Sequence, residues 1–165
     1  MLFRSNYLYA HRVTGDEGYA RTARELIAYV NRTLFDANDG FFYGSQDADE
    51  HYYTLDAEER AKLPAPFVDP TLYVNWNALM ASRYVEAAWT LDSVELLTQA
   101  QRVLAFLWAH CRDSEGAMHH FYDGTAKVSG LLTDQVTVAL AMLDAYDATS
   151  DRSYLDKAEI GRAHV

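Results

Sequence analysis

Apolar residues recur at helical spacing along most of the chain. Between residues 19 and 34 they follow one stripe and charged residues lie off it, as in an amphipathic helix with one wet side. A second one-sided pattern runs from 94 to 110. Segments 72–89 and 130–148 are apolar on nearly all sides, so each is expected to be surrounded by protein. The pattern predicts an all-α chain in which buried and one-sided helices alternate.

Short polar breaks join each buried helix to the one-sided helix after it, and such short junctions make antiparallel hairpins. The longer connections all fall at the opposite end. This arrangement predicts a partial (α/α)6 toroid of about three helical hairpins, roughly half of a ring. A plain helical bundle is the alternative, but it does not explain long connections confined to one end. The breaks carry a weak repeat: Ala10…Thr14-Gly15-Asp16…Ala23, Ala87…Thr90-Leu91-Asp92…Ala100 and Ala145…Thr149-Ser150-Asp151…Ala158.

The first long connection contains the most informative stretch of the chain, residues 40–53. It combines five aromatic side chains and three carboxylates with a glutamine, a serine and a histidine. Aromatic faces beside carboxylates suit a polar, ring-shaped ligand such as a sugar, and loops often carry binding sites. We therefore expect Tyr43 to be a stacking surface and Gln46 a polar contact. A helical turn capped by Asp56 and a strand over 118–122 are also expected in the connections.

Asp47 and Asp49 are the candidate acid and base of this stretch. In an extended segment they point the same way, and two neighbouring carboxylates raise the pKa of one of them, as acid–base chemistry on sugars requires. Alternatively, both carboxylates only cap the following turn or bind water. A calcium loop is a third interpretation, because Asp47, Asp49, His51 and Glu58 match EF-hand ligand positions. Tyr52 stands where that loop turns on glycine, so no metal site is predicted.

The starts of the two buried helices offer further polar and aromatic chemistry. Trp76 could stack on a sugar ring and Asn77 could donate hydrogen bonds, near free backbone N–H groups of a helix N-terminus. The alternative is a core tryptophan and a capping asparagine. Asp134 occupies the corresponding place on the next buried helix. In a ring, these residues would share one mouth with Asp47 and Asp49, and this convergence is the main sequence argument for a function.

His119 is a further candidate, because it lies with His120 in the next connection at the same end, and imidazole transfers protons near neutral pH. A surface histidine pair without a role is the alternative. Cys111 lies in an apolar helical context and is expected to be buried rather than nucleophilic. The sequence has no His-x-x-x-His pair, glycine-rich phosphate loop or Gly-x-Ser-x-Gly elbow, so zinc-protease, nucleotide-binding and serine-hydrolase classes lack support.

The amino-acid composition argues against some classes of binding partner. The chain has 165 residues, of which 50% are hydrophobic, and 14 basic against 24 acidic residues give a net charge of −10. Such a chain can bury a core, and its acidic balance disfavours nucleic acid and anionic membrane as partners. No run approaches the ~20 apolar residues of a membrane helix. We expect no cofactor.

The two ends resemble translated sequencing adapter rather than natural protein. The common adapter AGATCGGAAGAGCACACGTC, with one preceding base, encodes residues 159–165, and its reverse complement encodes residues 1–5 from a GTG start codon. We therefore expect residues 6–158 to be an internal piece of a longer gene. The lack of a signal peptide then says nothing about localisation, which stays open, with the cytoplasm favoured over secretion.

Three motifs, in this order, resemble the family of thioredoxin-domain-containing proteins related to spermatogenesis-associated protein 20: residues 44–49 (GSQDAD), 74–80 (VNWNALM) and 127–134 (KVSGLLTD). The resemblance covers nearly all of residues 6–158. It implies a toroid similar to N-acylglucosamine 2-epimerases and six-hairpin glycosidases, preceded in the family by a thioredoxin-like domain. That domain and its redox cysteines are absent here, so no redox activity is expected.

The sequence thus favours a fragment of a carbohydrate-active or carbohydrate-binding domain whose reaction is undefined, glycosidase- or epimerase-like if it is an enzyme. The fragment alone is expected to be inactive, and its expected partners are a carbohydrate, the missing thioredoxin-like domain and the rest of the toroid. The alternative is a non-catalytic helical interaction module for that domain. A half ring is also expected to expose apolar surface on its open sides, because its end helices lack neighbours.

Overall fold

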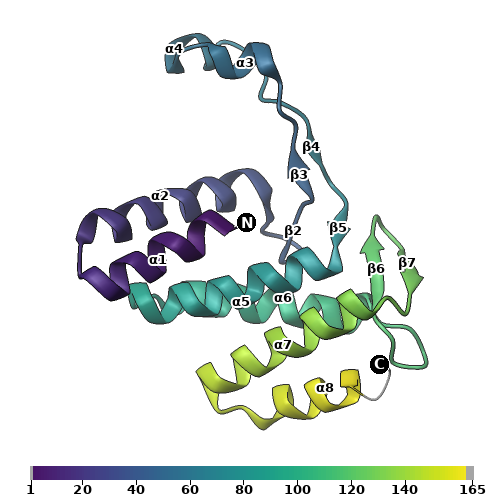
Figure 1. Cartoon of the computed structure of the whole chain (residues 1–165). Helices are drawn as coiled ribbons and strands as arrows, with labels where there is room; N and C mark the ends of the chain where they lie inside the picture. The colour runs from purple at the N-terminus through teal and green to yellow at the C-terminus, as the bar shows by residue number, and fades with distance from the viewer. Residues whose placement is uncertain (1, 163–165) are drawn as a thin grey trace.

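The computed structural model describes residues 2–162, and it describes side chains for residues 6–159. In this part of the chain, six long helices form three antiparallel hairpins (Figure 1). The hairpins are α1 (Leu2–Thr14) with α2 (Glu17–Leu34), α5 (Val74–Leu91) with α6 (Val94–His110), and α7 (Leu132–Thr149) with α8 (Arg152–Arg162). The expectation that residues 1–5 and 159–165 are not natural falls largely outside the described side chains, and it stays a prediction.

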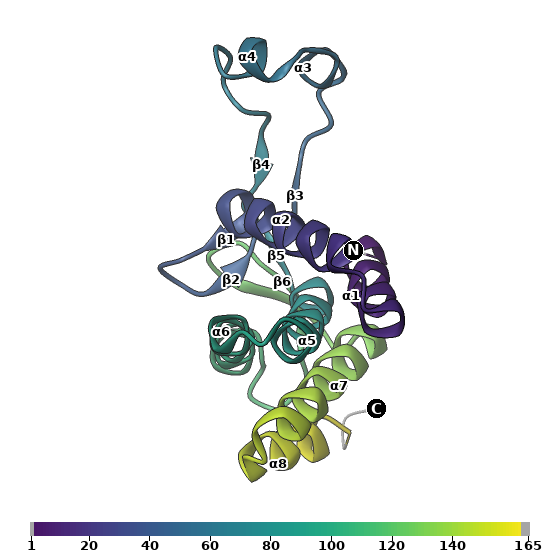
Figure 2. The same ribbon diagram turned by 90° about the vertical axis from the view of Figure 1, so that its left-hand side faces the viewer.

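The helices form an inner and an outer layer. α5 packs against both α1 and α7, while α2, α6 and α8 each lie outside their hairpin partner, as the end-on view in Figure 2 shows. α5 is buried along most of its length, whereas α2 buries only the stripe formed by Ala20, Ala23, Ile27 and Val30. The predicted alternation of a buried and a one-sided helix is therefore confirmed for α5 and α2. The expectation that residues 130–148 are surrounded by protein is wrong for one face of α7, where Leu140 is 54% exposed because none of the described helices packs on that face.

The three short junctions share one backbone register. Gly15, Asp92 and Ser150 each follow an inner helix in the left-handed conformation, with φ of 71°, 52° and 58°. When Gly15, Asp92 and Ser150 are aligned, the alanines of the predicted repeat align without gaps. The threonines do not, because Thr14 and Thr149 are equivalent and Leu91 occupies the same position in the middle junction. The sequence alignment through Thr90 was therefore wrong by one residue. The aligned alanines are Ala10, Ala87 and Ala145 before the junction and Ala23, Ala100 and Ala158 after it.

The connections at the opposite end contain short strands. β5 (Leu72–Tyr73), β6 (His119–Tyr122) and β7 (Ala126–Ser129) form a three-stranded antiparallel sheet that ties the two long connections together. The predicted strand over 118–122 is confirmed as β6. Two further pairs are β1 (Phe35–Asp36) with β2 (Phe41–Phe42) and β3 (Ser45–Gln46) with β4 (Val68–Asp69).

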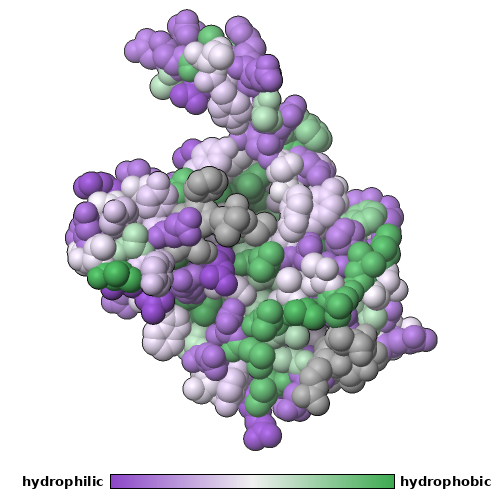
Figure 3. Space-filling model, in the orientation of Figure 1, coloured by the Kyte–Doolittle hydropathy of each residue, from purple (hydrophilic) through white to green (hydrophobic). Residues whose placement is uncertain are grey.

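Residues 45–69 form an arm that projects from the helical body (Figure 1). The arm rises on β3 and β4 and ends in two short helices, α3 (Glu50–Thr54) and α4 (Ala57–Arg60). Asp56 caps α4 in a complete capping box with Glu59, which confirms the predicted helical turn. The arm's surface is largely hydrophilic in the view of Figure 3.

Candidate functional site

Trp76 and Asp134 occupy equivalent positions at the loop end of the inner layer. Each is the third residue of its helix, Trp76 in α5 and Asp134 in α7. Trp76 is 41% exposed, whereas Asp134 is fully buried. The inner helices therefore present one aromatic surface and one enclosed carboxylate at the same end of the ring.

The buried Asp134 carboxylate binds His120 of β6. Its two oxygens lie 3.0 and 3.3 Å from Nδ1 of His120. It also accepts a hydrogen bond from the backbone N–H of Asn75, in the first turn of α5. The N-cap of α5, Tyr73, provides no side-chain cap of its own, so a carboxylate from the neighbouring helix supplies one. Asp134 thus joins α7, α5 and the sheet.

Burial raises the pKa of Asp134, and the opposing effects of His120 and the Asn75 N–H only reduce that rise. When ionised, the carboxylate can only accept hydrogen bonds, which assigns the Nδ1 proton to the imidazole and leaves Nε2 free to accept a proton. The His120 side chain is 34% exposed, so a ligand can reach it. The pair is arranged as an oriented general acid or base.

An aromatic wall connects this pair to Trp76. The Tyr73 ring lies 4.7 Å from the Trp76 ring and 6.2 Å from the His120 ring, measured between centroids. Phe121 extends the wall at 6.5 Å from Tyr73. Exposed aromatic faces beside polar groups that bind and transfer protons can hold a sugar by stacking and hydrogen bonding.

Opposite His120 in the β6–β7 hairpin, Val128 has a left-handed backbone, with φ of 58°. That conformation is costly for a β-branched side chain, by about 1–2 kcal/mol. β7 is therefore locally distorted at Val128, and such backbone distortions cluster at functional sites.

A cleft of about 290 Å³ lies beside Trp76 and brings together four of the residues predicted from sequence. Tyr43, Gln46, Trp76 and Asn77 line it, together with Tyr29, Leu34, Phe42, Gly44, Ser45, Tyr53 and Met80. Tyr73 connects the cleft to the His120–Asp134 pair, because its ring packs on Trp76 and lies 6.2 Å from the His120 ring.

The polar groups of this cleft already have protein partners. Gln46 Oε1 accepts hydrogen bonds from the hydroxyls of Tyr29 and Tyr53. The Tyr43 hydroxyl donates to Asp36 at 2.7 Å, a contact that lowers the pKa of Asp36 and raises that of Tyr43. Ligand binding by Tyr43 and Gln46 therefore stays a prediction, and it requires these contacts to be shared or exchanged.

Asn77 is a buried anchor for the preceding connection. Its Oδ1 accepts from the N–H of Phe42 at 2.7 Å, and its Nδ2 donates to the carbonyls of Phe42 and Tyr73 at 2.9 and 3.1 Å. Gln135, the equivalent residue of α7, accepts from the N–H of Met118 at 2.6 Å. This geometry corresponds to a structural role, and direct contact of Asn77 with a substrate stays a prediction.

Gly44 allows the arm to leave the body beside the cleft. A Cβ at this position would lie 2.8 Å from the Tyr73 ring and 3.2 Å from the carbonyl of Thr71. Only glycine fits this close approach without a shift of its neighbours. Gly44 therefore helps to set the position of Tyr73.

Asp47 and Asp49 lie on the exposed arm. The Asp49 carboxylate accepts from the N–H of Tyr52 at 2.9 Å and caps α3, which matches the capping alternative. The backbone N–H of Asp47 donates to Phe67 across the arm. Neither residue lines the cleft or contacts the His120–Asp134 pair, so their acid–base role stays a prediction without geometric support here.

His119 and His120 point to opposite sides of β6, because successive side chains of a strand alternate. It is His120, not the singled-out His119, that contacts Asp134. His119 is half-buried, and among the described residues no hydrogen-bond partner is present for its buried Nδ1. Its role as a sugar contact stays a prediction. Strand alternation separates His119 from His120, but the sequence does not show which side of the strand faces Asp134, so it carried no signal for His120.

A reactive cysteine, a metal site and a membrane-spanning helix are three other possible functional features of the described residues. Burial raises the pKa of Cys111 to about 12, which confirms a buried thiol rather than a nucleophile. No group of three or more His, Cys, Asp or Glu side chains among residues 6–159 is placed to hold a metal ion. None of the described helices combines the length and apolar character needed to cross a membrane.

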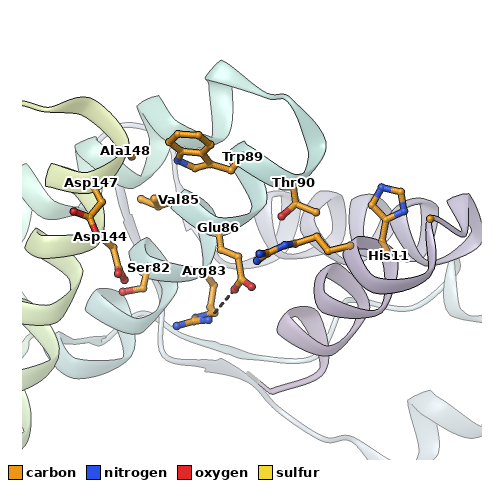
Figure 4. A pocket seen from close by; sticks show the side chains of 12 residues that line it. His11, Ser82, Arg83, Val85, Glu86, Trp89, Thr90, Asp144, Asp147 and Ala148 are labelled. Atoms are coloured by element: carbon orange, nitrogen blue, oxygen red, sulfur yellow. Dashed lines mark hydrogen bonds and ion pairs between the residues drawn. The ribbon is translucent and has the colours of Figure 1, made fainter.

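A larger cleft, about 950 Å³, lies between α1, α5 and α7 near the short junctions (Figure 4). It contains the Arg83–Glu86 ion pair at 2.7 Å and the exposed Trp89, but none of the residues predicted from sequence. This cleft is therefore separate from the candidate site at the loop end.

The three hairpins, with their inner and outer layers, form part of an (α/α)6 toroid. The chain superimposes on D-mannose isomerase with a TM-score of 0.77 and 17% identity, covering 99% of this chain and 38% of that one. Cellobiose 2-epimerase from Spirochaeta thermophila gives 0.77 and 14%, covering 96% and 40%. Unsaturated glucuronyl hydrolase from Bacillus sp. GL1 gives 0.75 and 17%, covering 96% and 42%.

At the sequence level, the chain is 31% identical to spermatogenesis-associated protein 20 of Rattus norvegicus over 111 residues, which cover 61% of this chain and 14% of the rat protein. No protein-family model matches the chain. The chain spans about two fifths of the similar toroids and a small part of the rat protein.

Proposed function

We propose that the chain contributes a carbohydrate site to an (α/α)6 domain, at the end where the long connections lie. The observation that carries this proposal is that Tyr73 links the exposed Trp76 ring, 4.7 Å away, to the His120 ring, 6.2 Å away, while the buried Asp134 holds the His120 imidazole. The names of the similar toroids, an isomerase, an epimerase and a hydrolase of sugars, support a carbohydrate as the ligand class.

In this proposal, Trp76 and Tyr73 stack against the apolar face of a sugar ring. His120 exchanges a proton through Nε2 with a group of that ring, while Asp134 holds the imidazole and stabilises its protonated form. The reaction is proposed as glycosidase- or epimerase-like. The adjoining cleft, with Tyr43, would take a second sugar unit or a substituent.

Asp47 and Asp49 are the second candidate acid–base pair. They follow Gln46, which lines the cleft, so a sugar that extends from the cleft toward the arm would approach them. Two carboxylates can work as acid and base at suitable separations. His119 would join this site only through a rearrangement of β6.

The similarity to spermatogenesis-associated protein 20, of which the chain spans 14%, supports a longer protein. The thioredoxin-like domain in that protein is a proposal that rests on the resemblance of the three sequence motifs. A non-catalytic interaction module is therefore the second candidate function. The observation that favours it is that three apolar side chains of the otherwise largely hydrophilic arm are exposed: Tyr53, Leu63 and Phe67 are 48%, 43% and 69% exposed. Such a projecting arm suits a protein partner.

A sugar-binding panel tests the first proposal against the second. The 165-residue chain is titrated with D-mannose, cellobiose and unsaturated glucuronyl disaccharide while tryptophan fluorescence is recorded. A saturable change that is lost in Trp76→Ala and kept in Trp89→Ala supports the carbohydrate site. If no sugar binds, or if both variants respond alike, the proposed site is wrong.

A further inference from the structure

α7 exposes a stripe of four large apolar side chains along one face. Leu132, Val136, Leu140 and Leu143 are 59%, 40%, 54% and 37% exposed, at the spacing of one helix face. In Figure 3, green apolar surface extends over the region where α7 crosses the front of the molecule in Figure 1. Single exposed leucines are ordinary, but a continuous stripe indicates an interface.

The register of the repeat shows what covers this face on the preceding inner helix. With Asp92 and Ser150 aligned, each α7 residue corresponds to the α5 residue 58 positions earlier. The counterparts of the stripe are buried, with exposures of 0%, 0%, 6% and 5%. They are Val74, Ala78, Ser82 and Val85.

α7 itself lies against that face of α5. Ser82 and Val85 share the large cleft with Asp144 and Ala148 of α7, which lie across from them in Figure 4. The stripe of α7 is therefore the face on which an inner helix receives the next inner helix of the ring.

The first inner helix exposes the complementary face. In the same register, Asp144 and Ala148 of α7 correspond to Tyr9 and Val13 of α1. Tyr9 is 64% exposed and Val13 is 66% exposed. The face of α1 that carries Tyr9 and Val13 is thus equivalent to the face of α7 that lies toward α5. On α1 this face is apolar and exposed to solvent.

The charges at the two edges are complementary as well. Within the chain, Trp89 of α5 shares the large cleft with Asp147 and Asp144 of α7. In the repeat register, the residue of α7 that corresponds to Trp89 is Asp147. The counterparts of those two carboxylates on α1 are Arg12 and Tyr9. A helix that docked on α7 in the α5–α7 geometry would therefore place Arg12 near Asp147.

We propose that two copies of the chain associate head to tail, with the α7 stripe of each copy against Tyr9 and Val13 of the other. Head-to-tail contacts close into a ring when the rotation fits. The described residues form three hairpins, half the number of an (α/α)6 ring, so two copies of the 165-residue chain would supply six hairpins and close a ring through two equal interfaces. The proposal goes beyond the proposed function, and its test needs no sugar.

Sedimentation and light scattering of the chain test this directly over a range of concentrations. We expect a mass of twice 18.7 kDa, and a dissociation constant raised at least about tenfold by Leu140→Glu. Val94→Glu is the matched control, because Val94 is 73% exposed on the outer helix α6. A monomer at all concentrations, or an open-ended series of larger species, would overturn the closed pair.

A charge exchange tests the register even if Leu140→Glu disturbs folding. Asp147→Arg is expected to weaken the pair, and addition of Arg12→Asp in the same chain is expected to restore it, since each interface then regains opposite charges. Circular dichroism verifies that each variant keeps its helices. Loss without restoration, in variants that stay helical, would contradict the proposed contact.

Discussion

Asn77 and Gln135 hold the same position in successive inner helices, and each binds the backbone of the connection that precedes its helix. Asn77 holds Phe42 through both its N–H and its carbonyl, and Gln135 holds the N–H of Met118. In these two hairpins a buried amide therefore fixes the connection that carries candidate functional side chains. The toroid positions its mouth by side chains of the inner layer, not by the loops alone.

Asn77→Ala is expected to lower the free energy of unfolding by about 1–3 kcal/mol, because it leaves the buried N–H and carbonyl of Phe42 without their partner. Denaturant titration measures the loss. Asn38→Ala, at an exposed turn, is the control and should change stability little. Equal effects of the two substitutions would mean that Asn77 does not anchor the connection.

Asp134 makes stability depend on pH in a direction opposite to most carboxylates. Because its pKa is raised in the folded chain, the folded state binds the proton more tightly than the unfolded state. Between the ordinary aspartate pKa of about 3.9 and the raised folded value, stability should therefore fall as pH rises. This contribution is fully present below that window and lost above it.

Urea unfolding of the wild-type chain and of Asp134→Asn at a series of pH values isolates the effect. Lowered pKa values, such as that of Asp36, act in both proteins and cancel in the difference. The stability of the wild type relative to the variant should decline through the window and then stay level. Asp39→Asn, at an exposed position between β1 and β2, serves as the control, and an equally pH-dependent difference there would contradict the assignment.

Gly44→Ala is expected to destabilise the chain by about 1–3 kcal/mol, because the added methyl group would meet Tyr73 and the carbonyl of Thr71. Displacement of Tyr73 should also weaken sugar binding. Ser45→Ala, at the exposed neighbouring position, is the matched control for stability. Unchanged stability and binding in Gly44→Ala would show that the close approach has no role in placing Tyr73.

Trp76→Ala is expected to weaken sugar binding about tenfold, equal to about 1.4 kcal/mol, through loss of the stacking surface. Trp89→Ala removes an exposed tryptophan near the opposite end of the same helix and should leave the affinity unchanged. Isothermal titration gives both affinities. A larger loss in Trp89→Ala would move the binding site to the cleft near the short junctions.

The helices and their layering were predictable because apolar periodicity over long segments reports burial directly. The stripe of α2 and the nearly all-round apolar character of α5 gave the alternation of layers. The strands β1 to β4 could not be predicted in this way, since two residues show no periodicity. The repeat was aligned one residue off at Thr90 because the middle junction has Leu91 where the other two junctions have threonine. There, only the left-handed backbone of Asp92 identifies the equivalent position.

The candidate site was predictable in part. Trp76 could be singled out from the aromatic and polar side chains at the loop end, and Asp134 from its position on the equivalent helix, whereas a sugar as the ligand stays a proposal. The contact between Asp134 and His120 could not be predicted, because it depends on which side of β6 faces α7. The projection of the arm, which carries Asp47 and Asp49 away from that pair, also depends on pairing between β3 and β4, and the sequence carries no clear signal for it.

The most direct test of the central claim is a nuclear magnetic resonance titration of the chain with cellobiose and D-mannose, observing the His120 ring nitrogens and the Trp76 and Trp89 indoles. Leu140→Glu gives a parallel sample in which the proposed pairing of copies is weakened. The account predicts saturable shifts at His120 and Trp76 and none at Trp89, with the His120 shift lost in Asp134→Asn. Shifts confined to Trp89, or binding that leaves His120 unperturbed, would contradict it.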